Sequence, residues 1–169
     1  MKALAVILVS VPLAALMDSA FADNVKAEVE GMKASGKPEV FAVQNGMYTC
    51  SSCQPEIKIK ANGESHAVPG NSDYDEMVVR VINPRSLEIV QQMNHKNRAF
   101  WGYNASADGK TLTVSYDDYS TGKEQKGGYT ATRVGAAPAG ALPISGSWKI
   151  EEINEGKAAG KTAAAPRPH

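Results

Sequence analysis

Two cysteines, Cys50 and Cys53, are separated by two residues and could support three kinds of chemistry. A redox-active dithiol needs a thiolate stabilised at a helix N-terminus, whereas the residues that follow, 56–60, alternate between polar and apolar as a strand does. A zinc site needs four ligands, and beyond the cysteines only His66 and His95 could join it from a distance. We therefore expect a structural disulfide, with redox activity and metal binding as the alternatives.

The spacing of this cysteine pair also predicts its local structure. In an extended chain, residues three apart hold their Cα atoms about 10 Å from each other, and a disulfide requires less than about 7 Å. A bond between Cys50 and Cys53 would therefore close a tight turn, with Ser51 and Ser52 at its tip.

The densest aromatic group consists of Phe100, Trp101 and Tyr103. In a strand Trp101 and Tyr103 share one face, and Phe100 points to the other. Packing in the core is the default role for such side chains, and lining a ligand pocket is the alternative. Trp101 and Tyr103 are our candidate ligand-binding residues.

Two acidic segments invite comparison with calcium sites. Residues 71–76 carry oxygen side chains at alternate positions, but Glu76 and Ile82 occupy places where a calcium loop needs a glycine and a bidentate glutamate. We expect a hydrogen-bonded turn leading into a strand at Met77. Asp117 and Asp118 are expected to face solvent in a loop.

The sequence carries none of the common catalytic signatures: there is no GxSxG elbow, HExxH helix, phosphate-binding loop or dinucleotide fingerprint. His66 and His95 lie beside turn formers and suit hydrogen-bonding or surface roles. We therefore predict no catalytic residue, no metal ligand and no cofactor.

Short runs rich in β-branched and aromatic residues follow one another along the chain. They cover residues 39–43, 56–60, 76–82, 86–93, 97–103, 111–116 and 128–134, and most alternate with period two. Turn formers such as Ala61-Asn62-Gly63 and Asn83-Pro84-Arg85 separate them, with no room for crossover helices. The pattern predicts an all-β fold, an antiparallel meander whose sheet is curled or forms a partly open barrel.

The two ends of the chain differ from this central region in composition. Lys2, an apolar run over residues 3–16 and the small-x-small pattern of residues 20–22 predict a signal peptide, 1–22, cleaved after Ala22. We expect a flexible leader at 23–38, where Val25 and Val29, four residues apart, also allow a short helix. A β-sheet domain is expected at 39–134 and a linker at 135–142. Residues 143–154 look like an extra strand or the start of an incomplete second unit, and 155–169 like a disordered tail.

The overall charge excludes one class of partner. The chain has 18 basic and 18 acidic side chains, so it lacks the surplus of lysine and arginine with which nucleic-acid binders neutralise phosphates. After the predicted cleavage site, no apolar stretch is long enough to span a membrane. The sequence therefore predicts a periplasmic or secreted protein, in a compartment where disulfides persist.

Several motifs resemble a group of uncharacterised exported bacterial proteins built from β-rich, lipocalin-like units in tandem. The motifs are YTCSSC at 48–53, HAVPGN at 66–71, YDEM at 74–77, ADGKTLT at 107–113 and SGSWK at 145–149. The resemblance covers roughly residues 40–150 and implies export and an all-β unit, with no established activity. In that group a Gly-x-Trp strand opens each unit, but none precedes Cys50 here.

Together these observations predict an exported, non-enzymatic β-module that binds a small hydrophobic ligand or associates with an envelope protein. The first alternative is a periplasmic thiol-disulfide redox protein that uses Cys50 and Cys53. The second is a structural or interaction module in which a free sheet edge accepts a strand from another chain.

Overall fold

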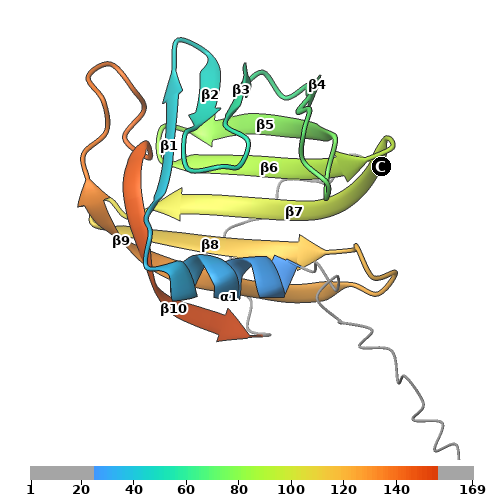
Figure 1. Ribbon diagram of the computed structural model, residues 1–169. Coiled ribbons are helices and arrows are strands. Elements are labelled where there is room, and N and C mark those ends of the chain that lie inside the picture. Colours follow the sequence, from blue (N-terminus) through green and yellow to red (C-terminus); the bar gives the residue numbers. More distant parts are fainter. Residues whose placement is uncertain (1–24, 156–169) are drawn as a thin grey trace, which may run out of the picture.

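The computed structural model describes residues 25–155, which form one antiparallel sheet of ten strands and one helix (Figure 1). The predicted all-β fold is confirmed. The helix is α1 (Val25–Ser35), and the strands are β1 (Glu39–Gln44), β2 (Met47–Cys50), β3 (Ile57–Lys60), β4 (Ser65–Ala67), β5 (Glu76–Asn83), β6 (Ser86–Met93), β7 (Lys96–Ala105), β8 (Thr111–Asp118), β9 (Gln125–Gly135) and β10 (Gly146–Glu155). The predicted signal peptide, 1–22, and residues 156–169 of the predicted tail lie outside the described residues.

The sheet curls into a nearly closed barrel. Its order is β3-β2-β1-β10-β9-β8-β7-β6-β5-β4, so every strand except those at the seam pairs with two neighbours. Closure comes from β1 and β10, where Glu39 lies opposite Trp148 and Phe41 opposite Gly146. The seam falls between β3 and β4, which makes this the partly open barrel that the hairpin pattern predicts.

Period-two alternation determines which side chains face the interior. In β3, Ile57 and Ile59 are buried while Lys58 and Lys60 are exposed. The same alternation in the longer strands fills the barrel with aliphatic and aromatic side chains, among them Phe41, Val79, Leu87, Ile89, Leu112, Val114 and Tyr129. Only one face of each strand is therefore packed in the core.

Two strands, β2 and β4, are absent from the sequence prediction. β2, with the sequence MYTC, is as long as β3 but does not alternate between polar and apolar residues, and β4 has only three residues. The turn before β2 can be recognised in the sequence, as the pair Asn45-Gly46. Both residues have positive φ, at 52° and 73°. Asn-Gly is the preferred pair for a two-residue hairpin turn of this kind.

The prediction of a flexible leader is wrong for residues 25–35, which form α1. Val25 and Val29, one helical turn apart, are both completely buried, and the helix packs against β10 on the concave side of the sheet (Figure 1). This burial stabilises a helix that its polar sequence alone would not sustain.

Two neighbouring aspartates correct a second expectation, because Asp117 and Asp118 lie in β8 rather than in a loop. Asp118 is only 1% exposed rather than facing solvent, and its Oδ2 accepts the Val25 N–H at 2.9 Å. Its Oδ1 accepts the Ser120 N–H at 2.8 Å. The first turn of a helix has N–H groups without partners in the helix, and Asp118 satisfies one of them from a strand 93 residues away.

Residues 143–154 contribute β10 to the same sheet, and Arg133 stabilises its start. The Arg133 guanidinium stacks 4.1 Å over the Trp148 ring and donates to the carbonyls of Ser145 and Pro143, both at 2.7 Å. Gly146 has a φ of 134°, and a side chain there would collide with this guanidinium. The glycine of the Gly-Ser-Trp segment therefore leaves the space that the Arg133 guanidinium occupies.

Candidate functional site

The barrel contains a cavity of about 580 Å³ on the side of α1, β1 and the disulfide turn. Four aromatic residues line it: Tyr48, Tyr74, Trp101 and Tyr103. Its aliphatic and thioether side chains include Met32, Val40, Met77, Ile89 and Ile150. The cavity is therefore mostly apolar, with polar groups at a few defined positions.

Both candidate ligand-binding residues, Trp101 and Tyr103, lie in this cavity wall. They share the inner face of β7, and their ring centroids are 6.4 Å apart. Phe100 is on the opposite face, where it packs edge-on against Tyr119. The prediction that Trp101 and Tyr103 share one face is confirmed.

A buried glutamine fixes the orientation of the Trp101 indole. Trp101 Nε1 donates to Gln91 Oε1 at 3.1 Å, and Gln91 is only 5% exposed. The other side of the ring packs near Tyr116, with centroids 5.4 Å apart. The indole is thus held in one position at the cavity wall.

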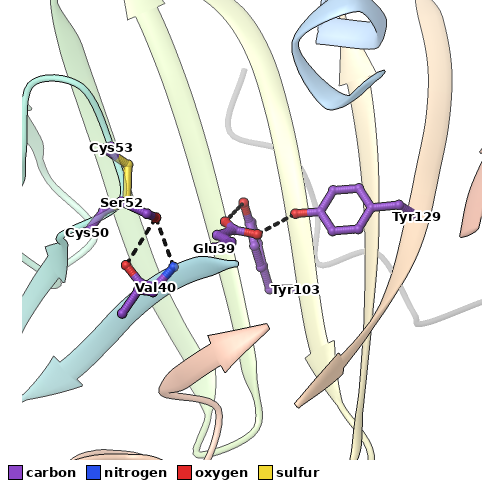
Figure 2. Close-up of a disulfide and its surroundings, with 7 residues drawn as sticks. All are labelled: Glu39, Val40, Cys50, Ser52, Cys53, Tyr103 and Tyr129. Carbon is purple, nitrogen blue, oxygen red and sulfur yellow. Dashed lines mark hydrogen bonds between the residues drawn. A yellow bond between two sulfur atoms is a disulfide. The ribbon is translucent and has the colours of Figure 1, made fainter. Parts of the chain in front are cut away.

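Cys50 and Cys53 form a disulfide at the edge of the cavity, with their Cα atoms 5.4 Å apart (Figure 2). The turn that it closes attaches to β1 through Ser52, whose Oγ accepts the Val40 N–H at 2.8 Å and donates to the Val40 carbonyl at 3.4 Å. Cys50 is the last residue of β2 and Cys53 lies in the turn that follows, so neither is at a helix N-terminus, and Cys50 is 1% exposed. This setting suits a structural bond that holds the cavity wall.

Glu39 places a carboxyl group beside Trp101 and Tyr103, as Figure 2 shows for Tyr103. Its Oε1 accepts the Tyr103 hydroxyl at 3.1 Å, and its Oε2 accepts the Tyr129 hydroxyl at 2.7 Å. Burial raises the pKa of Glu39, and the two hydroxyl hydrogen bonds oppose that rise by stabilising the anion. Burial and then the Glu39 charge raise the pKa of Tyr103 and of Tyr129 well above the usual value, so both remain donors.

Sequence reasoning did not find Glu39, although a pattern that could identify it is present. Glu39, Phe41 and Val43 occupy alternate positions of β1, and the last two are core residues. Side chains at i, i+2 and i+4 point to the same face of a strand. A carboxyl on the core face is unusual and points to a partner or a function.

Glu28 adds a second carboxyl to the cavity, from α1. The side chain reaches solvent, yet surrounding protein atoms raise its pKa from 4.5 to about 7. Burial is the largest cause; Arg98 lowers the pKa, and the charges of Asp73, Glu39 and Asp118 raise it. This residue was missed because its segment was expected to be a flexible leader.

The remaining sequence candidates do not gather at the cavity. His66 Nε2 lies 2.8 Å from Asn62 Oδ1, and His95 Nδ1 lies 2.9 Å from Glu76 Oε2. Within residues 25–155, no three histidine, cysteine, aspartate or glutamate side chains are placed to hold a metal ion. No helix in that same range is long and apolar enough to cross a bilayer.

The predicted turn at residues 71–76 is confirmed. Asn71 Oδ1 accepts the Asp73 N–H at 2.8 Å and the Tyr74 N–H at 3.3 Å. Asn71 and Tyr74 also line the cavity. The local hydrogen bonds of this loop therefore set the position of one aromatic wall residue.

Together these groups form an aromatic pocket with two carboxyl groups, which is equipped to bind and orient a small molecule. Searches with the chain against protein-family models, curated proteins and solved structures gave no match.

Proposed function

We propose that this protein is an exported, non-enzymatic binding protein that holds a small, largely apolar molecule in the barrel cavity. The observation that carries the proposal is the cavity of about 580 Å³ with Tyr48, Tyr74, Trp101 and Tyr103 in its wall. Small-molecule sites typically measure roughly 300–1,000 Å³ and combine an apolar lining with a few polar groups. This cavity has both properties.

The wall of the cavity also supports the proposal because several elements hold it in place. Its residues come from α1 and from strands that include β1, β2, β6, β7 and β10. Hydrogen bonds between strands and the Cys50–Cys53 bond fix those elements. A preformed wall loses little conformational entropy when a ligand binds.

Tryptophan fluorescence tests the proposal, since the chain has two tryptophans and only Trp101 lines the cavity. We expect 1-decanol, or a ten-carbon chain with a charged head, to change the emission saturably. Trp101→Phe should remove the response, because Trp148 is buried under Arg133. Phe100→Leu, on the outer face of β7, is the matched control and should preserve it.

The proposal of ligand binding would be overturned if neutral, cationic and anionic ten-carbon chains all failed to produce a saturable response in the folded protein. Native mass spectrometry of protein purified from its host provides a second readout. We expect it to reveal a bound small molecule that is absent from a variant with a filled cavity, such as Ile89→Trp.

Export is a separate part of the proposal. It is supported by the predicted signal peptide, by the resemblance to exported lipocalin-like proteins and by a disulfide, which is compatible with an oxidising compartment. Intact mass measurement after expression in a bacterium should find a chain that begins at Asp23. A chain found in the cytoplasm with residues 1–22 retained would contradict this part alone.

A further inference from the structure

We propose that the ligand carries a cationic amine head group, which Glu28 and Glu39 hold among the aromatic rings of the cavity, while its apolar part contacts the aliphatic wall. This inference rests on the proposed binding function and names the class of ligand. It follows from the charges, the free acceptor positions and the aromatic lining of the cavity.

The charges inside the cavity favour a cation. Among the described residues, its charged lining consists of Glu28, Glu39 and Lys37. Lys37 and Glu28 are exposed, whereas Glu39 is half-buried beside the core residue Phe41. The buried Arg98 acts on Glu28, whose pKa it lowers, so Glu39 is the carboxyl group of the cavity whose pKa no cation of residues 25–155 shifts. A ligand carboxylate or phosphate near Glu39 would therefore place its charge next to a like charge in a poorly solvated position, which is unfavourable.

The carboxyl group of Glu39 is oriented but not saturated. Among residues 25–155, each oxygen accepts one tyrosine hydroxyl, from Tyr103 and Tyr129 respectively. A carboxylate offers about four acceptor positions, so each oxygen can still accept an N–H donor from a ligand. An ammonium group supplies such donors, and its hydrogen bonds to a carboxylate are strengthened by charge.

The aromatic lining supports the same head group. Trp101, Tyr103, Tyr48 and Tyr74 line the same cavity as Glu28 and Glu39. The faces of aromatic rings carry negative potential and attract ammonium groups. Met32, Met77, Ile89 and Ile150 form the remaining apolar wall, which matches an alkyl or aryl tail rather than a bare cation.

The test compares four ligands that share a ten-carbon chain: decylamine, decyltrimethylammonium, 1-decanol and decanoate. Trp101 fluorescence would be titrated at pH 8, below the micelle concentration of each ligand. We expect the better of the two cations to bind about tenfold or more tightly than the alcohol and decanoate to bind most weakly. If decylamine binds and decyltrimethylammonium does not, the N–H donors determine the specificity. If both cations bind, the positive charge and the aromatic rings determine it.

Two carboxamide substitutions locate the effect. Glu28→Gln and Glu39→Gln should each reduce the preference for the cation severalfold while the affinity for 1-decanol stays unchanged. Glu30→Gln is the matched control on α1, because Glu30 is exposed and pairs with Lys26. Glu28 reaches solvent, so its variant keeps the test valid if Glu39→Gln does not fold.

Two results would overturn this inference and leave the binding function standing. One is equal or tighter binding of 1-decanol or decanoate relative to both cations. The other is a cation preference that neither Glu28→Gln nor Glu39→Gln reduces. Failure of all four ligands to bind would instead reject the proposed function and this inference together.

Discussion

At the scale of single residues, Glu28 and Glu39 show how one cavity gives two carboxyl groups different properties. Glu39 is fixed by two tyrosine hydroxyls, whereas Glu28 reaches solvent and has a pKa of about 7. Glu39 therefore has a defined orientation, and Glu28 can change its charge near neutral pH. A cation bound between them would favour the ionised form of both.

The raised pKa of Glu28 predicts how stability depends on pH. An acid with a folded-state pKa above its unfolded value binds more protons in the folded state, so folding is favoured most at low pH. The Glu28 contribution should therefore decrease as pH rises from 4.5 to about 7. Urea unfolding of the wild type and of Glu28→Gln at pH 5 and pH 7.5 measures it.

In that experiment, the stability of the wild type relative to Glu28→Gln should be lower at pH 7.5 than at pH 5. Glu30→Gln serves as the control, and its difference from the wild type should not follow that trend. A difference between wild type and Glu28→Gln that stays constant with pH would contradict the assignment.

Among the site residues, alternation along a strand separates those that could be predicted from those that could not. Trp101 and Tyr103 could be placed on one face because period two applies wherever a strand forms. Glu39 could have been found by the same rule, from Phe41 and Val43. Glu28 could not, because its position depends on the packing of α1 against a sheet whose strands lie later in the sequence.

At the scale of elements, the strands with a clear period were predicted, and the errors lie in short or polar segments. β2 has no polar–apolar alternation in its sequence MYTC, and β4 has only three residues. α1 buries only two apolar side chains, Val25 and Val29, so its own sequence resembles that of a flexible segment. Tertiary contacts from β8 and β10 supply what the local sequence lacks.

The Asp118 contact leads to a prediction about α1. Asp118→Ala removes the acceptor of the Val25 N–H, and the loss of a helix cap typically costs about 0.5–2 kcal/mol. Amide hydrogens of residues 25–35 should therefore exchange faster, and 1-decanol should bind more weakly because Glu28 and Met32 line the cavity. Hydrogen exchange followed by mass spectrometry measures the first effect.

A neighbouring aspartate provides the control for this prediction. Asp117 lies on the other face of β8, with a carboxylate oxygen 4.0 Å from Lys126 Nζ. Asp117→Ala should leave exchange in residues 25–35 at the wild-type rate. Unchanged exchange in Asp118→Ala would show that α1 does not depend on this cap.

At the scale of the whole molecule, Arg133 on β9 joins the segments that lead into the two neighbouring strands, β8 and β10. Beyond its contacts with Trp148, Ser145 and Pro143, its Nε donates to the Gly109 carbonyl at 2.5 Å. It thus connects the turn before β8 to the segment that leads into β10, the strand that closes the barrel.

We expect Arg133→Lys to destabilise the protein by about 2 kcal/mol or more, because a lysine ammonium cannot direct several donors in the planar arrangement of a guanidinium. Urea unfolding followed by circular dichroism measures the loss. Arg85→Lys, at an exposed position of the β5–β6 turn, should leave the free energy of unfolding unchanged. Equal stability of Arg133→Lys and the wild type would show that charge alone is sufficient at this position.

The pairing of β1 with β10 has a consequence for the order in which the chain folds. Most ladders of the sheet join strands that are neighbours in the sequence, whereas β1 and β10 bring together residues more than 100 positions apart. The entropy cost of closing a loop grows with its length, so the hairpins can form early while the barrel closes late. We therefore expect the cavity, whose wall includes residues of both β1 and β10, to be completed at the final step of folding. A binding assay during refolding should report on that step, and circular dichroism on earlier ones.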